Sequence, residues 1–228
     1  MTAGPRKHRE ETDSRAIRSG MTSSYYVEMA GSAVFAISGV LAVTRRGLDI
    51  VGAVMLGIVT AIGGGTVRDL VIGIRPFWIA DFNYVRAACA GALAAFWIGW
   101  LFRTALKGVL YLDALGAALF AIAAANKVLL LTGSAPVAVV MGVLTGIGGG
   151  LIRDVLAGRP TLLMGRDIYA TPIMIGCASF VLLRAFVPTF AYADVAGMVL
   201  IFTGRALAIH QHLQMPVWLT AQDAESAL

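Results

Sequence analysis

Seven long apolar segments constrain what this chain of 228 residues can fold into more than any other feature of its sequence. A helix needs roughly 20 mostly apolar residues to cross the hydrocarbon core of a bilayer. Segments of about this length, bounded by charged or turn residues, lie at about residues 25–44, 50–72, 84–102, 110–131, 136–157, 169–187 and 190–209. The sequence therefore predicts an all-α polytopic membrane protein with seven transmembrane helices.

The composition excludes several other classes of protein. Hydrophobic residues make up 58% of the chain and charged residues only 14%, and the mean hydropathy is +0.80. Soluble domains contain about 45–50% apolar and about 25% charged residues. A soluble enzyme, a secreted disulfide scaffold and a disordered protein are therefore excluded, and we expect the chain to lie in a lipid bilayer.

Both ends of the chain are polar. Residues 1–24 are predicted to form a disordered tail, and residues 213–228 a C-terminal tail. The connectors after the odd-numbered segments, together with the C-terminus, carry seven Arg or Lys residues, Arg205 among them, whereas the even connectors carry three. Basic connectors tend to stay in the cytoplasm. We therefore expect an outside N-terminus and a cytoplasmic C-terminus, although five basic residues in the N-terminal tail argue against this orientation.

The chain contains an internal repeat whose two copies align at a constant offset. Both copies contain the motif GxxTxIGGGxxRD, at residues 57–69 and 142–154, and 17 of the 46 positions from Glu28 to Gly73 are identical to their counterparts. Each copy holds three helices, an odd number, so the second copy must enter the membrane upside down. We expect a first repeat at residues 25–107, an inverted repeat at 108–188 and a seventh helix at 189–212. Inverted repeats are typical of transporters and channels, whose pathway lies at the repeat interface.

Three consecutive glycines occur in the second helix of each copy. A glycine costs a helix roughly 1 kcal/mol relative to alanine, and broken backbone is tolerated in a membrane only where it is buried in protein or lines a water-filled cavity. The motif therefore predicts two kinked or unwound helices whose freed carbonyl groups coordinate a cation, with Thr60 and Thr145 one turn earlier. The glycines expected along this pathway are Gly63, Gly64, Gly65, Gly148, Gly149 and Gly150. Close helix packing through small residues would explain the same glycines without a pathway.

The Arg-Asp pair that closes each motif places charges close to the membrane interior, where an unpaired charge costs several kcal/mol. Because neighbours at positions i and i+1 do not face each other on a helix, we expect Arg68 to pair with Asp154. By the same argument Arg153 pairs with Asp69, or each arginine binds carbonyl groups freed at the glycines. Such pairs either lock the two halves together or gate a pathway. Lys127, inside the fourth helix, either reaches the membrane interface or faces a pore.

The remaining polar groups show no pattern of catalysis. Glu28 and Asp113 occupy equivalent positions at helix starts, where we expect them to interact with the helix dipole rather than with a ligand. Cys89 and Cys177 lie in apolar sequence without metal-binding spacing. The chain has neither a catalytic constellation nor a basic stripe for nucleic acid. We therefore expect no enzymatic activity, no cofactor, no metal site and no nucleic-acid partner.

The doubled GGGxxRD motif in seven apolar segments, followed by RPFW at residues 75–78, resembles the prokaryotic trimeric intracellular cation (TRIC) channel family. The repeated domain of that family is also described as a glycine-transporter domain. The resemblance covers about residues 25–212 and implies a homotrimer of the bacterial inner membrane. Each protomer would have its own pore, between kinked second and fifth helices. The resemblance also implies that monovalent cations, chiefly potassium, pass through the pore. The second copy departs from the first after the motif, where it lacks an equivalent of Phe77 and Trp78.

Three functional hypotheses follow. The first is a potassium-preferring channel in which the motif charges and Lys127 hold or gate the pore. Its partners would be two further copies of the chain in a homotrimer, membrane lipid and monovalent cations. The second is a secondary transporter of glycine or another small zwitterion, whose carboxylate group would bind at a half-helix N-terminus. The third is a scaffold protein that conducts nothing.

Overall fold

The computed structural model describes residues 5–44, 46–99, 106–165 and 167–215. In these ranges the chain forms eight α-helices and one 3-10 helix, and no strand beyond an isolated bridge between Asp167 and Gln214. The elements are α1 Pro5–Val43, α2 Ile50–Val71, α3 Phe77–Ala80, α4 Asn83–Ile98, α5 Leu106–Thr132, α6 Ala135–Leu156, η1 Leu162–Met164, α7 Ala170–Phe186 and α8 Ala193–Gln211. Apart from the short helices α3 and η1 and the polar first part of α1, these helices coincide with apolar segments of the sequence, and the all-α class is confirmed.

Several of these helices are built to lie in a bilayer. Five of them are long and apolar enough to cross a membrane: α1 from Ser24 onward, α2, α5, α6 and α8. Helices α4 and α7 are shorter, with 16 and 17 residues. Large apolar side chains such as Val71, Val155 and Trp97 are exposed on the outer surface. A surface of this kind is stable against lipid rather than water.

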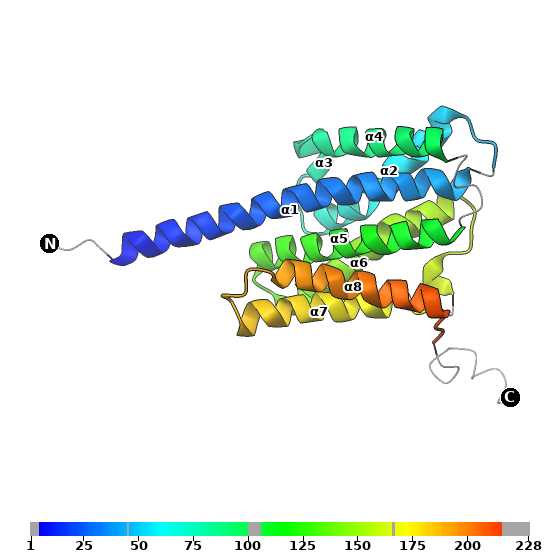
Figure 1. Cartoon of the computed structure of the whole chain (residues 1–228). Helices are drawn as coiled ribbons and strands as arrows, with labels where there is room; N and C mark the ends of the chain where they lie inside the picture. The colour runs from blue at the N-terminus through cyan, green and yellow to red at the C-terminus, as the bar shows by residue number, and fades with distance from the viewer. Residues whose placement is uncertain (1–4, 45, 100–105, 166, 216–228) are drawn as a thin grey trace.

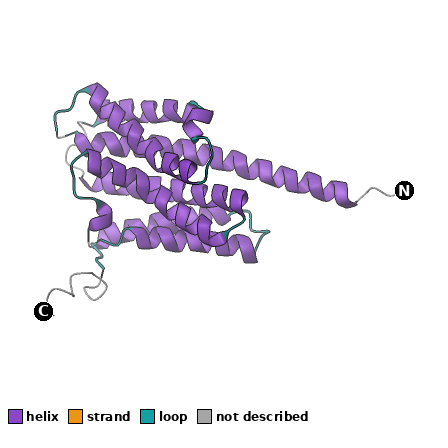
Figure 2. Ribbon diagram, turned by 180° about the vertical axis from the view of Figure 1, so that it is seen from behind, coloured by secondary structure: helices purple, strands orange, loops and turns teal. Residues whose placement is uncertain are grey.

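The helices form a bundle of near-parallel rods, with α1 and α4 on one side, α7 and α8 on the other, and α5 between them (Figure 1). Helix α1 packs against α2, α4 and α5, while α6 packs against α2, α5 and α7. Helix α8 covers α5 and α7. Seen from behind, the bundle is helical throughout, with loops at its two ends (Figure 2). The two halves of the sequence therefore meet mainly through α1 with α5 and α2 with α6.

The contact between α1 and α5 is built from two glycine–phenylalanine pairs. A Cβ atom at Gly31 would lie 2.8 Å from the Phe120 ring, and a Cβ at Gly116 would lie 2.9 Å from the Phe35 ring. The two rings lie against each other, with centroids 5.5 Å apart, and both are buried. Each phenylalanine thus fills the space left by the glycine on the opposite helix. The two pairs occupy equivalent positions of the two repeats.

The ends of α2 and α6 are defined by local chemistry. Asp49 caps α2, since its Oδ1 accepts a hydrogen bond of 2.8 Å from the backbone N–H of Gly52. Gly73 and Gly158 follow the two helices with φ values of +72° and +55°. Glycine adopts this left-handed conformation without a steric penalty, and it commonly ends helices for that reason. At both positions the glycine turns the chain back toward the helix that has just ended.

The N-terminal segment differs from the prediction. Helix α1 begins at Pro5 and continues through most of the segment for which the sequence predicts a disordered tail. Polar residues such as Glu, Arg and Lys have high helix propensity. Adding a residue to an existing helix is also much easier than nucleating a new one. The apolar span after Ser24 therefore provides a nucleus from which the helix extends outward.

Candidate functional site

Helices α2 and α6 touch backbone to backbone at the repeated glycines. A Cβ atom at Gly64 would lie 2.5 Å from the carbonyl oxygen of Thr145, and one at Gly149 would lie 2.7 Å from the carbonyl oxygen of Thr60. A Cβ at Gly148 would lie 3.0 Å from the Cα atom of Gly64. Real Cβ atoms essentially never approach other atoms within 3.0 Å. Only glycine at these positions allows the two helices to cross at this distance.

The helices continue through the glycines, so the expectation of unwound backbone is wrong. Helix α2 runs from Ile50 to Val71 and α6 from Ala135 to Leu156 without interruption. The hydroxyl of Thr60 donates a hydrogen bond of 2.7 Å to the carbonyl oxygen of Leu56, one turn back in its own helix. The hydroxyl of Thr145 donates an equivalent hydrogen bond of 2.6 Å to the carbonyl oxygen of Met141. The glycines serve the close approach of two intact helices, because a missing side chain permits contact without breaking the backbone hydrogen bonds.

The third glycine of each motif meets a different kind of group in each half. A Cβ at Gly65 would lie 2.5 Å from the ring of Phe77. A Cβ at Gly150 would lie 2.5 Å from Oδ1 of Asp113 and 2.9 Å from the hydroxyl of Tyr169. In the first half, an apolar ring therefore fills the space beside the third glycine. The second half presents polar oxygen atoms there instead.

A group of four charges, three of them buried, surrounds the end of α2, and we call it the α2 cluster: Glu28, Arg68, Asp69 and Lys127. Arg68 Nη1 donates a hydrogen bond of 2.6 Å to Oε1 of Glu28, and Arg68 Nε donates one of 2.8 Å to Oδ1 of Asp69. Lys127 Nζ, from α5, donates 3.1 Å to the same Oδ1. Glu28, Arg68 and Asp69 are all buried. Two acids and two bases leave the cluster with no net charge.

A matching group, the α6 cluster, surrounds the end of α6: Asp113, Arg153, Asp154 and Arg205. Arg153 Nη1 donates a hydrogen bond of 2.8 Å to Oδ1 of Asp113, and Arg153 Nε donates one of 2.9 Å to Oδ1 of Asp154. Arg153 Nη1 also donates 2.6 Å to the hydroxyl of Ser38 on α1. Arg205 Nη2, from α8, lies 3.7 Å from Oδ2 of Asp113. All four charged residues are buried, and this cluster is also neutral.

The crossed pairs expected from the sequence are wrong. Each arginine pairs with the acid on the first helix of its own half, Arg68 with Glu28 and Arg153 with Asp113. Each also bends back onto the adjacent aspartate, since three methylene groups let a guanidinium reach a neighbour that its backbone direction does not face. Glu28 and Asp113 are therefore ion-pair partners rather than helix-dipole partners.

The aspartates also organise the connectors that follow. Oδ2 of Asp69 accepts a hydrogen bond of 2.8 Å from the backbone N–H of Phe77, eight residues later. Oδ2 of Asp154 accepts one of 3.3 Å from the N–H of Leu162, again eight residues later. Each carboxylate thereby ties a buried arginine to the start of the next helix. Because the same aspartate binds both groups, a movement of the arginine is expected to displace the connector as well.

Lys127 faces a cavity of about 520 Å³ beside the α2 cluster. The cavity is bordered by the carboxylate-bearing residues Glu28 and Asp81 and by the aromatic rings of Tyr25 and Tyr84. The Lys127 side chain is 27% exposed, whereas its partner Asp69 is fully buried. The Lys127 ammonium group therefore lies between the buried carboxylate of Asp69 and this cavity.

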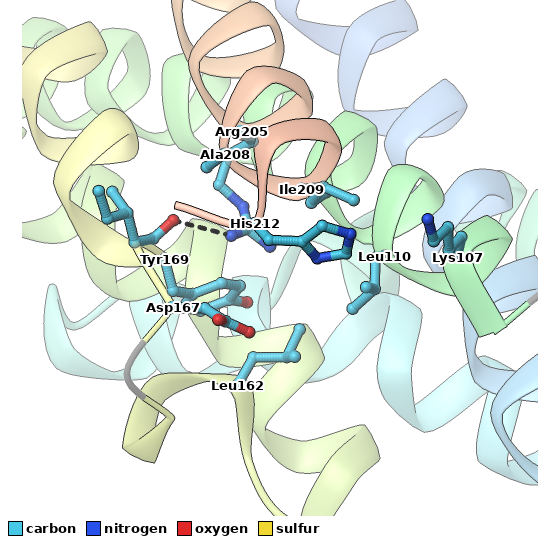
Figure 3. Close-up of a pocket in the computed structure, with 10 residues that line it drawn as sticks. Lys107, Leu110, Leu162, Asp167, Tyr169, Arg205, Ala208, Ile209 and His212 are labelled. Carbon is cyan, nitrogen blue, oxygen red and sulfur yellow. Dashed lines mark hydrogen bonds between the residues drawn. The ribbon is translucent and has the colours of Figure 1, made fainter. Parts of the chain in front are cut away.

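Arg205 was missed as a site residue, because the sequence places it among the connector charges. It lies inside α8, only 2% exposed. Its Nη1 donates 3.1 Å to the carbonyl oxygen of Ile168, and its guanidinium lies 4.3 Å from the centre of the Tyr169 ring. Figure 3 shows it reaching from α8 toward the segment that carries Tyr169, at a cavity of about 70 Å³. A lone arginine within an apolar span was the available signal, since such a charge requires a partner.

Comparison with known proteins places the chain in a family. A family model described as "Glycine transporter" matches it twice, over residues 25–100 and 110–185. The chain belongs to this family. The two matches cover the two halves that the repeated motif relates.

Relatives of this glycine-transporter family member are bacterial membrane proteins. A UPF0126 membrane protein of Vibrio cholerae is 38% identical over 85% of this chain and 82% of its own length. The UPF0126 inner membrane protein YadS of Escherichia coli is 37% identical over 85% of this chain and 95% of its own length. The names of these relatives agree with the bacterial membrane location expected from the sequence.

A solved structure extends the comparison to the fold. The TRIC trimeric intracellular cation channel orthologue from Rhodobacter sphaeroides is 36% identical and covers 84% of this chain and 100% of its own, with a TM-score of 0.80. The resemblance of the duplicated motif to TRIC channels is confirmed by this match. The neighbour is an ion channel, and the match points to no enzymatic family.

Proposed function

We propose that this chain is a cation channel of the bacterial inner membrane, a homotrimer in which each protomer conducts monovalent cations and prefers potassium. The observation that carries the proposal is the likeness to a trimeric cation channel over the whole length of that channel, at a TM-score of 0.80. In this proposal seven helices span the bilayer as two inverted three-helix repeats and a final helix. The N-terminus lies outside the cell and the C-terminus inside.

The pathway in this proposal follows the crossing of α2 and α6 through each protomer. The α2 and α6 clusters stand at the C-terminal ends of these helices, around Arg68 and Arg153. In an inverted arrangement these ends point to opposite sides of the membrane. The charges would then control the two ends of the pathway, and the glycine crossing would lie between them. The residues assigned to this middle part are Thr60, Gly63, Gly64, Gly65, Thr145, Gly148, Gly149 and Gly150.

The crossing is closed in this arrangement. The backbones touch at Gly64 and Thr145, which leaves no room for an ion between them at that point. Conduction therefore requires α2 and α6 to move apart. The α2 cluster ties α2 to α1 and α5, and the α6 cluster ties α6 to α5 and α1. In this proposal these ion pairs oppose the movement of either helix away from the crossing and so act as gates.

The larger cavity is bordered by two acids, Glu28 and Asp81, and by two bases, Arg75 and Lys127. In this proposal Asp81 is the acid that attracts cations to it. Asp81 lies between α3 and α4 at the border of this cavity, outside the spanning helices. The backbone N–H of Asn83 and the hydroxyl of Tyr25 each donate 2.9 Å to its carboxylate. These hydrogen bonds lower the pKa of Asp81, so the group stays ionised at neutral pH. A fixed negative charge at a mouth raises the local concentration of cations.

The decisive experiment is planar-bilayer recording of the purified full chain in asymmetric potassium chloride, followed by glycine on one side. Discrete current steps that reverse near the potassium equilibrium potential and ignore glycine are expected. A silent bilayer together with saturable uptake of labelled glycine into proteoliposomes would replace the channel by a zwitterion transporter. Silence in both assays would favour a scaffold.

A further inference from the structure

The two charged clusters obtain their second base from positions that are not equivalent. The counterpart of Lys127 in the first repeat is Ala42, which carries no charge. In the α6 cluster the second base is Arg205 of α8, a helix outside both repeats. The charge balance of the α6 cluster therefore depends on the last helix.

Arg205 occupies a site made of oxygen atoms and an aromatic ring. Its Nη1 donates 3.1 Å to the carbonyl oxygen of Ile168, and its guanidinium lies 4.3 Å from the centre of the Tyr169 ring. Its Nη2 lies 3.7 Å from Oδ2 of Asp113, and the Arg205 side chain is only 3% exposed. Carbonyl oxygens, carboxylate oxygens and aromatic faces are groups that also bind free cations.

The contacts of Arg205 in this site are incomplete. Among the side chains that the structure describes, Oδ2 of Asp113, the hydroxyl of Tyr169 and Nε of Arg205 are buried without a hydrogen-bond partner. A separation of 3.7 Å is too long for a hydrogen bond. The cavity of about 70 Å³ adjoins the guanidinium and is bordered by Asp167 and His212 (Figure 3). The guanidinium therefore has space into which it can withdraw.

We propose that Asp113, Tyr169 and the carbonyl group of Ile168 form a binding site for a monovalent cation, and that Arg205 is the tethered cation that fills it in the closed state. The inference rests on the proposed function and deepens it by assigning the gate beside α8. When Arg205 withdraws, the cluster retains two carboxylates and one arginine, and the net charge of −1 attracts a permeating cation. When Arg205 returns, the site is neutral and occupied.

The test uses Arg205→Met, which removes the charge and keeps an unbranched side chain. We expect the purified variant to bind one radioactive Rb⁺ per protomer in choline chloride buffer, at least about tenfold more tightly than the unmodified protein. In potassium chloride the open probability is expected to rise about tenfold. Arg184→Met is the matched control, because Arg184 forms its ion pair of 2.9 Å with Asp194 of α8, which is not part of the α6 cluster. The control should change neither readout.

Further variants separate the cation site from a structural role. Asp113→Asn added to Arg205→Met is expected to abolish the gained Rb⁺ binding. A folded Arg205→Met protein without a gained Rb⁺ site overturns the proposal. If that variant does not assemble, Arg205→Lys keeps the charge with fewer donors and should raise the open probability about threefold; an unchanged open probability then overturns it. A silent unmodified protein contradicts only the proposed function, since Rb⁺ binding to Arg205→Met is measured without conduction.

Discussion

Lys127 of α5 and Asp69 of α2 form an ion pair of 3.1 Å that joins the two halves of the chain. The oxygen that accepts from Lys127 also accepts from Nε of Arg68 at 2.8 Å. The other oxygen of Asp69 accepts from the backbone N–H of Phe77 at 2.8 Å. One carboxylate thus connects both halves and the turn after α2. Because its partners differ in burial, their loss is expected to have unequal effects.

Lys127→Met is expected to change gating more than stability. The ammonium group is partly exposed and Asp69 keeps two other donors, so the free energy of unfolding should fall by about 1 kcal/mol or less. Loss of one of the ion pairs that hold the α2 cluster should raise the open probability in planar-bilayer recordings. Arg86→Met, an exposed change on α4, serves as the control. Gating identical to that of the unmodified protein would remove Lys127 from the gate.

A double-mutant cycle tests the pairing within the α2 cluster. Arg68→Met alone leaves the buried Glu28 carboxylate without its ion-pair partner, which costs about 3–5 kcal/mol of unfolding free energy. Glu28→Gln alone costs less, because Arg68 keeps its ion pair with Asp69. The double variant should lose less than the sum, with a coupling energy of about 1–3 kcal/mol. The same cycle with Arg68→Met and Asp154→Asn should give a coupling near zero. Unfolding in detergent, followed by circular dichroism, provides the measurement, and strong coupling to Asp154 would restore the crossed pair.

Gly64→Ala is expected to force α2 and α6 apart. The added Cβ would lie 2.5 Å from the carbonyl oxygen of Thr145, a backbone atom that cannot rotate away. Overpacking of this kind costs about 1–3 kcal/mol. Gly165→Ala is the matched control, because its Cβ would lie 3.5 Å from the nearest atom and its φ of −74° suits any residue. Equal unfolding midpoints for the two variants would contradict the close crossing.

Asp81 should make stability depend on acidity in a narrow range. Hydrogen bonds from the backbone N–H of Asn83 and from the Tyr25 hydroxyl lower the pKa of its carboxyl group below the ordinary value of 3.8. The lowered pKa stabilises the folded state at pH values above 3.8, and this contribution is lost as the pH falls further through the folded-state pKa. Asp81→Asn should lose the contribution at neutral pH and show a flatter acid profile. Thermal unfolding of both proteins between pH 7 and about pH 2 checks this difference.

The same variant tests the cavity as a cation vestibule. At low potassium chloride concentration Asp81→Asn should reduce single-channel current, because the fixed charge no longer concentrates cations. At high salt the difference should shrink, since mobile ions screen the charge. A reduction that does not depend on salt would point to a structural effect instead.

Much of the fold follows from the sequence alone. The apolar segments coincide with the long helices, because a segment in hydrocarbon must satisfy its own backbone hydrogen bonds and helices do so locally. The contacts of Phe35 and Phe120 with the glycines opposite, seen in the structure, involve positions that the internal repeat relates. The polar N-terminal segment was misjudged, because helix propagation from a neighbouring span depends little on polarity.

The partners of the charges were decided by tertiary structure. The sequence determined that Arg68 and Arg153 need counter-charges, but the crossed choice was wrong because helix rotation and side-chain reach select the acids on α1 and α5. Nothing local indicates that Arg205 of α8 meets Asp113, which lies far earlier in the chain, since that contact requires α8 to pack on α5. Hydropathy and helix formation act over a few turns and can be predicted from neighbours. The choice among buried charges depends on which helix faces meet, and only the packed bundle determines that.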